Sequence, residues 1–522
     1  MGVFDTVVLT AQYAVLLLIP YLILLGGYRV LAHPLRHYPG PPLARLSDVY
    51  GAFYAWNRNL YLRTYADHLN YGPVIRQGPN KLVFNSVAAV HDIYANDRVS
   101  KSLSYVAYTV NPGKTNVINT VNKPVHRVKR KLVGAVVTER SMRTFEPTMT
   151  EQIDIFIKLL LPSPQGSSNN VVNMSTRCRH LGMDIAGYLG FGYALKLQTD
   201  NENRFLLPGM NGGLWRLNIY MQYPSLRKLG YEIVEIALTF IKGKGFLSTL
   251  TKMIQARLAQ DKDAHHDLYA FMADALDAPD GDKISLSEIW TEGISFLPAA
   301  GDTTSATLSA LFFYLSRNAH CRRRLADEIR STFASSDEIR GGAQLTSCRY
   351  LRACIDEALR MSPPVPGTLW RQQLPQDGDA PWVVDGHVIP PGTQVGVSHY
   401  ALHHNEEYFP DPFSFKPERW LPADEVSKEP SAANRAAFVA FSLGARGCAG
   451  KAMAYLEVGL VSAKTLWYFD FEPASEYGAL GRDTNEMGEF LLHDVFTSSH
   501  DGPYLTFTPR GDLWKELAGQ GQ

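Results

Sequence analysis

The segment FSLGARGCAG at positions 441–450 restricts the fold of this chain more than any other stretch. It places one cysteine, Cys448, among three glycines and directly before a long apolar run with the pattern of a helix. Glycine allows a close approach of the backbone and permits positive φ, and the N-terminus of a helix stabilises a nearby thiolate. The segment therefore predicts a thiolate in a tight backbone turn, and a purely structural cysteine is the alternative.

The composition excludes several classes of function. The 522 residues are enough for one large core or for two lobes. They carry 51 basic and 51 acidic side chains, and without a basic surplus nucleic acid is not expected as a partner. The five cysteines include no CxxC pair, so neither a disulfide framework nor a structural zinc site is predicted. Most of these thiols are expected to be small buried residues in a reducing compartment.

The first segment has the length of a membrane helix. Positions 7–27 contain no charged side chain, and at about 1.5 Å per residue they span roughly the 30 Å core of a bilayer. Asp5 precedes the segment and Arg29 follows it, which predicts that the body of the chain lies on the cytosolic side. A cleaved signal peptide is the alternative, but it has a shorter apolar part and a basic start. The predicted domains are a transmembrane anchor at 1–30, a proline-rich extended hinge at 31–45 and the main domain at 46–522.

The rest of the chain is predicted to be mainly α-helical with a smaller β-rich lobe. Helical periodicity dominates from about position 92 to position 333. Strand patterns occur at 72–86 and at 382–397, and each is interrupted by glycine and proline turn signals. No repeat and no long low-complexity linker divides the main body, so one domain is expected there.

The longest predicted helix, at 285–318, has polar residues at its centre. A capping-box pattern opens it, and its sequence is apolar on nearly all sides. Pro298 removes one backbone hydrogen bond, and Asp302 and Thr303 follow, although burying both is costly. Two interpretations stay open: a kinked core helix whose hydroxyl groups bond to the preceding turn, or a break that delivers protons to a dry cavity.

Two pairs of opposite charges follow further along the chain. Glu357 and Arg360 are three residues apart on a predicted helix and share one of its faces. The segment PERW contains Arg419 next to another glutamate. Each pair alone is typical of a solvated surface bridge with little effect on stability. Between the two pairs, His403 and His404 are predicted to lie at a surface corner.

Taken in order, these segments resemble the cytochrome P-450 family. The haem signature of that family, FxxGxRxCxG, is met by Phe441, Gly444, Arg446, Cys448 and Gly450. The AGxDTT, ExxR and PERF motifs of the family correspond to AAGDTT, to the first glutamate–arginine pair and to PERW. All four motifs have the expected order and separation. The chain is therefore identified as a member of this family, of the microsomal, membrane-anchored type common in fungi.

The resemblance implies a role for the cysteine and for the centre of the long helix. Cys448 would be the axial thiolate ligand of the iron in haem b. Asp302 and Thr303 would form the acid–alcohol pair that supplies protons on the opposite side of the ring. Ala300 stands where the family usually has glycine. The groove for oxygen is therefore expected to be narrower, unless Gly301 compensates.

The resemblance also assigns the charged residues around the haem. The two propionates would be bound by four side chains, Arg446, Arg371, His126 and Arg130. A buried structural network that holds the thiolate loop in place would consist of Glu357, Arg360 and Arg419. Three further cations are expected to face outward, either as solvated charges or as a docking patch for a flavoprotein: Arg127, Lys129 and Lys131.

The function implied by the resemblance is that of a monooxygenase, which inserts one oxygen atom from O2 into a lipophilic small molecule. Electrons would come from NADPH through a separate cytochrome P-450 reductase, with or without cytochrome b5, since the chain has no GxGxxG dinucleotide motif. The enzyme would lie at the endoplasmic reticulum membrane, with the haem-thiolate catalytic domain at 46–522 in the cytosol. Apolar and aromatic residues predict the substrate contacts at 102–120, 205–224, Ile294, Leu297 and 366–369.

An oxidation in fungal secondary-metabolite biosynthesis is the leading prediction for the pathway. Oxidative phenol or aryl coupling at the same haem, a benzoate or xenobiotic hydroxylase, and a non-catalytic haem-binding membrane protein are the alternatives. No sequence feature separates hydroxylation from coupling. The intact pair of Asp302 and Thr303 argues against the non-catalytic alternative.

Overall fold

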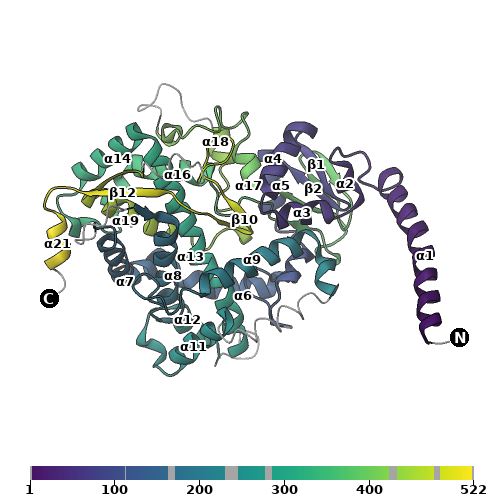
Figure 1. The fold of residues 1–522 in the computed structure, drawn as a ribbon, viewed down its shortest axis with the longest axis horizontal. Coiled ribbons are helices and arrows are strands. Elements are labelled where there is room, and N and C mark those ends of the chain that lie inside the picture. Colours follow the sequence, from purple (N-terminus) through teal and green to yellow (C-terminus); the bar gives the residue numbers. More distant parts are fainter. Residues whose placement is uncertain are drawn as a thin grey trace.

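The structure is a computed structural model that describes residues 3–111, 113–162, 171–229, 245–276, 285–422, 432–474 and 483–519. The described chain is mainly helical, and a smaller lobe contains a five-stranded sheet (Figure 1). The predicted division into a helical body and a smaller β-rich lobe is therefore confirmed.

One long helix, α13 (Leu286–Arg317), runs through the centre of the helical body (Figure 1). Its capping box is formed, because the backbone N–H of Ser285 donates to Oε2 of Glu288 at 2.9 Å. Most of its side chains are buried, which explains the nearly continuous apolar sequence. α13 can therefore supply residues to a cavity in the middle of the protein.

The helices around α13 pack closely against it. A Cβ atom on Gly182 of α8 (Met174–Phe191) would lie 2.6 Å from the carbonyl oxygen of Gly301, so glycine is needed where α8 crosses α13. α16 (Arg349–Met361) and α19 (Lys451–Tyr468) also contact α13. Other helices of the helical body are α6 (Lys123–Val136), α7 (Glu139–Lys158), α9 (Leu206–Gln222), α11 (Phe246–Leu258), α12 (Leu268–Leu276) and α14 (Ala319–Thr332).

The β-rich lobe is built on a five-stranded sheet with the order β1-β2-β8-β5-β3. β2 and β8 are parallel, whereas the other neighbours are antiparallel. The two predicted strand segments are confirmed, although the first part of the second segment forms a separate hairpin, β6–β7. The strands of the lobe are β1 (Val74–Gly78), β2 (Lys81–Phe84), β3 (Ser100–Lys101), β5 (Arg371–Gln372), β6 (Trp382–Val384), β7 (His387–Ile389) and β8 (Gln394–Val397).

Of two further sheets, one connects segments that are far apart in the sequence and the other is a local hairpin. β12 pairs with both β4 and β9, and β10 and β11 form a hairpin. Their bounds are β4 (Val171–Asn173), β9 (Phe469–Pro473), β10 (His493–Val495), β11 (Thr497–Ser499) and β12 (Tyr504–Pro509). Apart from α1, the remaining helices of the described ranges are α2 (Pro42–Leu46), α3 (Val49–Trp56), α4 (Leu60–Tyr71), α5 (Val87–Tyr94), α15 (Ala343–Ser347), α17 (His399–His403), α18 (Ala432–Ala437), α21 (Trp514–Gly519), η1 (Leu103–Tyr108), η2 (Pro224–Leu229), η3 (Lys262–Ala264), η4 (Ser336–Glu338), η5 (Pro375–Asp377), η6 (Pro417–Trp420) and η8 (Gly444–Arg446).

The first helix, α1 (Val3–Leu31), projects away from the rest of the protein (Figure 1). Several of its apolar side chains are exposed, among them Leu17 at 74% and Leu24 at 73%. None of the helices within the described ranges combines the length and the apolar character that crossing a membrane requires. The first segment is thus helical, as predicted, and a membrane role for this helix stays a prediction. The hinge after it is only partly extended, because Pro42 takes the first position of α2, where its φ suits a helix.

Candidate active site

The loop around Cys448 makes the tight turn that its glycines predict. Gly444 has a φ of 68°, and a Cβ atom there would overlap the backbone oxygen of Tyr94, so a larger residue would displace the chain. The N–H of Cys448 donates to the carbonyl of Phe441 at 2.8 Å and closes the loop. Gly450 directly precedes α19, which starts where the sequence predicts a helix.

Cys448 is the exposed one of the five cysteines, and it lines a cavity between its loop and α13. Although its side chain is open to the cavity, the surrounding protein atoms keep bulk water away from the thiol, and this raises its pKa. The amide of Gly450 and the charges of Arg130 and Lys451 lower the pKa but do not cancel the rise. The loop alone therefore favours the neutral thiol. Coordination to a metal cation deprotonates a thiol. The environment thus suits a metal ligand better than a free nucleophile.

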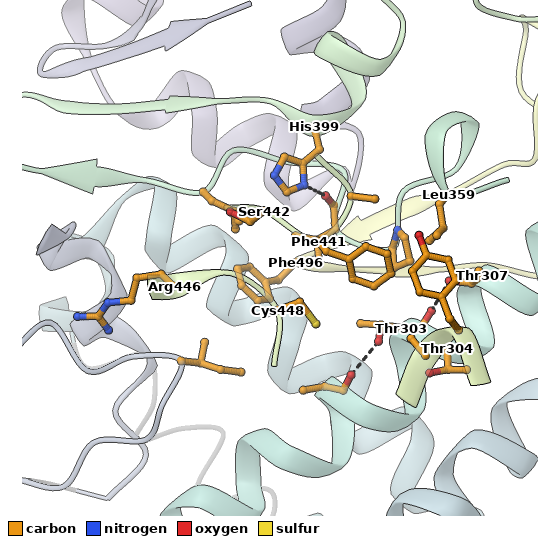
Figure 2. Close-up of a pocket in the computed structure, with 18 of the residues that line it drawn as sticks. Thr303, Thr304, Thr307, Leu359, His399, Phe441, Ser442, Arg446, Cys448 and Phe496 are labelled. Atoms are coloured by element: carbon orange, nitrogen blue, oxygen red, sulfur yellow. Dashed lines mark hydrogen bonds between the residues drawn. The ribbon is translucent and has the colours of Figure 1, made fainter. Parts of the chain in front are cut away.

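The cavity consists of two adjoining hollows with volumes of about 220 and 250 Å³. Both are lined by Cys448, Thr303 and Arg446, and Cys448 lies between the other two in Figure 2. The remaining walls are mostly apolar, so the space suits a largely apolar ligand. The apolar and aromatic residues that line the first hollow include Tyr105, Ile118, Ala299, Leu359, Val365, Leu369 and Phe496.

The predicted substrate segments contribute unequally to these walls. Side chains from 102–120 and from 366–369 line the first hollow, as predicted. Neither hollow is lined by a described residue of 205–224, nor by Ile294 or Leu297. The last two are packed in the main apolar core instead. The segment between β3 and α6 and the segment between α16 and β5 thus shape the cavity more than the predicted contacts within helices do.

The central helix presents Thr303 to the cavity, whereas Asp302 contacts α8. Oγ1 of Thr303 donates to the carbonyl of Ala299 at 2.7 Å, so this hydroxyl group bonds to the preceding turn and also lines the cavity. Asp302 is buried, and its Oδ1 accepts from Nε of Arg179 at 3.0 Å. Burial holds the pKa of Asp302 above its usual value, and Arg179 reduces this rise without cancelling it. Of the predicted acid–alcohol pair, only the alcohol lines the two hollows, and the relay by the acid stays a prediction.

Ala300 lines the second hollow, and Gly301 beside it faces α8. A Cβ atom on Gly301 would lie 2.6 Å from Sδ of Met183, so this glycine is required for the contact between the two helices. Because Gly301 packs against α8 and lines neither hollow, it does not offset the methyl group of Ala300. A narrower groove for oxygen stays a prediction.

Basic side chains gather at the cavity, and they are Lys101, His126, Arg130, Arg371 and Arg446. Four of the five are predicted from the sequence, and Lys101 is an addition. Arg446 donates to the carbonyl of Thr120 at 2.7 Å, and Arg130 donates to that of Gly447 at 2.6 Å. Within the described ranges, no carboxylate oxygen lies within 4.0 Å of the charged nitrogens of these arginines or of the lysine. The cluster thus carries a surplus of positive charge.

This surplus of charge favours an anionic ligand. Burial, together with the neighbouring arginines, holds the pKa of Lys101 well below its usual value. Burial, and then the charge of Arg446, lowers the pKa of His126 to about 3, so His126 is neutral at pH 7. Burial likewise lowers the pKa of Arg446 to about 10, with Arg371 contributing. Carboxylates placed among these groups would relieve the repulsion, and a haem carries two of them as propionates.

The predicted charge network of Glu357, Arg360 and Arg419 is formed and buried. Arg360 donates through Nε and Nη2 to the two oxygens of Glu357 at 2.9 and 2.8 Å, and Nε of Arg419 donates to Glu357 at 3.2 Å. Burial raises the pKa of Glu357, but the two arginines outweigh it and hold the pKa below its usual value. The alternative of a solvated surface bridge is therefore wrong.

The prediction of a surface corner at His403 and His404 is wrong, because both side chains are buried. Nδ1 of His403 donates to the carbonyl of Arg360 at 3.2 Å, and its Nε2 accepts from the N–H of Val439 at 3.1 Å. Nε2 of His404 lies 2.6 Å from a carboxylate oxygen of Glu489. The local sequence is polar, as in a surface turn, and the partners that bury the two histidines come from segments remote in the sequence. His403 thereby links α16 to the segment before the cysteine loop.

The outward orientation predicted for Lys129 is also wrong. Its Nζ lies 3.0 Å from Oε1 of Glu292 in α13, and the two side chains are 5% and 1% exposed. Arg127 and Lys131 are exposed, as predicted. A docking patch on this helix would therefore consist of these two residues.

Comparison with known proteins identifies relatives over nearly the whole chain. Residues 57–495 match the family model described as cytochrome P-450. Cytochrome P-450 monooxygenase apf7 of Gibberella fujikuroi is 31% identical over 509 residues, which cover 94% of this chain and 96% of the relative. Cytochrome P-450 monooxygenase poxM of Penicillium oxalicum is 32% identical over 492 residues, covering 93% and 92%. Cytochrome P-450 monooxygenase AKT7 of Alternaria alternata is 32% identical over 496 residues, covering 92% and 94%.

The thiol, the basic cluster and the apolar walls of this cavity fit a haem. Cys448 would ligate the iron, and the cluster of five basic side chains would hold the propionates. A fold of this kind around such a site is that of a haem-thiolate enzyme. Because the family model and the relatives cover almost its full length, the chain belongs to the cytochrome P-450 family and is a monooxygenase. The bound haem supplies the activation of dioxygen, while the chain supplies the thiolate, the hydroxyl group of Thr303 and the apolar walls.

Lys101, Leu359 and Phe496 are among the cavity residues that sequence reasoning did not single out. Lys101 lies in a short strand, and only its charge distinguishes it. Leu359 lies on α16 between the two charged residues of its motif. Phe496 forms the tip of the β10–β11 hairpin with a φ of 84°, which is uncommon for an aromatic residue. A strained residue at a cavity wall is typical of a functional position, but its backbone angle is not readable from the sequence.

Proposed function

We propose that this monooxygenase oxidises a lipophilic small molecule in fungal secondary-metabolite biosynthesis. The apolar wall beside Thr303, formed by Ile118, Leu359, Val365 and Phe496, is the observation that carries this proposal. Such walls bind a ligand by removing its apolar surface from water, and they disfavour a charged ligand because its hydration is lost. The relatives support the activity, since all three are cytochrome P-450 monooxygenases of fungi.

In the proposed reaction, Thr303 moves a proton at the cavity wall. Its hydroxyl proton is donated to the carbonyl of Ala299 at 2.7 Å, so its oxygen can accept a hydrogen bond from the cavity side. Donation toward the cavity requires rotation of the side chain away from Ala299. Asp302 would then replace the proton, after its carboxylate leaves Arg179 and takes up a proton from water. The apolar walls would keep bulk water away from these steps.

Titration of the purified haem-loaded protein with a panel of metabolites tests the substrate class. A substrate that displaces water from the haem iron shifts the absorption spectrum before any turnover. We expect shifts with neutral terpenoid, polyketide or alkaloid compounds and none with charged metabolites of similar size. Shifts produced only by charged compounds would contradict the proposal. The mass of the product under labelled dioxygen then separates oxygen insertion from coupling, because coupling leaves no label in the product.

We also propose that the electrons come from NADPH through a separate reductase, with cytochrome b5 as an optional second donor. The exposed cations Arg127 and Lys131 on α6 would attract an acidic partner surface. Such attraction is screened by salt. The rate of haem reduction by the reductase should therefore fall with rising ionic strength, and less steeply in Arg127→Gln/Lys131→Gln. An unchanged salt dependence in this variant would exclude the two residues as a docking site.

We further propose that the N-terminal region anchors the enzyme at the endoplasmic reticulum membrane with the catalytic domain in the cytosol. Exposed apolar side chains on α1 support this, and so do Val49, Phe53 and Trp56 of α3. Burial of this surface in lipid would remove it from water. Removal of residues 1–30 should release the protein from microsomes. Protease added to intact microsomes should digest the catalytic domain of the full-length enzyme, because this domain would lie on their outer side. Retention of the shortened chain by alkaline-washed membranes would contradict an anchor confined to α1.

A further inference from the structure

The residues at 113–122, which lead into α6, form one wall of the haem cavity. Ile118 lines both hollows, and Val117 lines the second. Nζ of Lys101, one of the basic side chains at the cavity, donates to the carbonyl oxygen of Ile118 in this segment. The backbone N–H of Val117 is held from α13, where it donates to Oε2 of Glu292 at 3.0 Å. The segment is thus fixed between the basic cluster and the central helix.

Glu292 makes the two contacts on which this attachment depends. Oε2 accepts the N–H of Val117, and Oε1 lies 3.0 Å from Nζ of Lys129 in α6. The carboxylate is 1% exposed and lines the second hollow. It precedes Thr303 by about three helical turns on the same face of α13, roughly 16 Å along the axis. One side chain therefore joins the loop, α6 and the cavity face of α13.

The other contacts between this loop and α13 are weaker. Nζ of Lys114 lies 3.8 Å from Glu288, and 39% of this lysine and 21% of this glutamate are exposed. Nδ2 of Asn111 lies 3.5 Å from Oγ1 of Thr291, which is the upper limit for a hydrogen bond. Neither contact holds a backbone group of the loop. The Val117 amide is therefore the main attachment of the loop to this helix among the residues described.

We propose that Glu292 is a positioning residue that sets the shape of the substrate cavity by holding the loop at Val117. Lys129 compensates the buried charge of Glu292, while the acceptor oxygen of Glu292 holds the loop. Loss of the acceptor leaves a partly buried N–H without a partner, and the loop then moves toward solvent to hydrate it. Ile118 moves with it, so the cavity accepts bulkier ligands. The proposal depends on the chain and its haem, and not on the identity of the substrate.

Two double variants separate the acceptor from the charge. Lys129→Met/Glu292→Gln removes both charges but keeps an oxygen at position 292 for the Val117 amide. Lys129→Met/Glu292→Leu removes both charges and the acceptor. Neither variant leaves an unpaired buried charge, and replacement of a buried ion pair by uncharged residues is often neutral for stability. The pair of variants thus differs only in the group offered to the loop.

Hydrogen exchange at Val117 and the size selectivity of the cavity are the two measurements. Exchange is followed by mass spectrometry of peptides covering 113–122 in the haem-loaded protein. Selectivity is the ratio of the dissociation constants of imidazole and 4-phenylimidazole, which bind the haem iron and shift its spectrum. In the variant with leucine at position 292, we expect exchange at least tenfold faster and a severalfold shift of the ratio in favour of 4-phenylimidazole. The variant with glutamine should match the wild type in both measurements within about twofold.

The result that overturns the proposal is equal behaviour of the two double variants in exchange and in selectivity. If both lose thermal stability to the same extent but keep the wild-type ratio, Glu292 has only a structural role. Glu288→Gln is the matched control, because Glu288 lies 3.6 Å from the same lysine but holds no backbone group of the loop. It should leave exchange and selectivity unchanged. Should a double variant fail to bind haem, exchange at Val117 in Glu292→Gln against Glu292→Leu tests the same difference, and equal exchange there also overturns the proposal.

Discussion

Replacement of Glu357 by glutamine would remove the negative charge between two buried arginines without changing the volume of the side chain. Oε1 accepts from Arg360, Arg419 and the backbone N–H of Lys416, and Oε2 accepts from Arg360 and Trp420. The amide nitrogen of glutamine must take the place of one oxygen and would then face two or three donors. At least two hydrogen bonds are therefore lost, in addition to the charge.

The loss should amount to about 3–5 kcal/mol of the free energy of unfolding, the cost of leaving a buried charge without its partner. This is a large part of the total of about 5–15 kcal/mol that is typical of a folded protein. The effect should also reach the haem. Arg360 donates to the carbonyl of His403 at 2.9 Å, and His403 accepts the N–H of Val439, close before the cysteine loop. We therefore expect Glu357→Gln to bind less haem through Cys448.

Urea unfolding and the spectrum of the reduced carbon-monoxide complex measure the two effects. The first gives the change in the free energy of unfolding, and the second gives the fraction of haem with a thiolate ligand. Lys416→Gln is the matched control, because its bridge to Asp411 is exposed and should contribute little to stability, while its backbone bond to Glu357 is kept. If Glu357→Gln lost no more stability and no more thiolate-bound haem than this control, the reasoning about the network would be refuted.

Thr303→Ala should lower product formation and increase the release of hydrogen peroxide while haem stays bound. Thr303→Ser keeps a hydroxyl group and should form most of the wild-type amount of product. Equal amounts of product and peroxide in the two variants would count against the role of the hydroxyl group. Gly444→Ala should reduce haem content, because the added Cβ atom overlaps the backbone oxygen of Tyr94, and a normal absorption spectrum after purification would contradict this. Burial raises the pKa of Glu457 from 4.5 to about 8, so its contribution to stability falls as the pH rises from 4.5 to 8. The thermal stability of Glu457→Gln minus that of the wild type should therefore be larger at about pH 9 than at about pH 5. If this difference in stability did not depend on pH, the carboxyl group would not be buried as a neutral acid.

The cysteine loop and the central helix were predictable because their structure depends on neighbours in the sequence. The turn at Gly444 and the start of α19 after Cys448 follow from residues within about ten positions. The capping box of α13 likewise needs only two residues three positions apart. The network around Glu357 was found from a motif, although its burial requires the fold. Local geometry, in these cases, is already the geometry of the site.

Other orientations were not predictable, because the partner that decides them is remote in the sequence. Asp302 contacts Arg179 on α8, 123 positions away. Lys129 is buried because Glu292 is placed against it, and without that partner a lysine in a basic run is expected in solvent. His403 and His404 are in a polar segment, yet both are enclosed by segments from elsewhere. A polar side chain goes inside only where the fold supplies its hydrogen bonds.

The residues of this chain were enough to identify the haem-thiolate family, because its motifs are short-range patterns with few physical interpretations. The resemblance then predicted Cys448 as the ligand and four of the five basic side chains that gather at the cavity. The shape of the substrate cavity was decided only by the fold. Phe496, Ile118 and Glu292 come from three separate elements, and their positions depend on how a hairpin, a loop and α13 pack together. Packing is a property of whole surfaces in contact, and no single segment carries the information about the surface that will meet it.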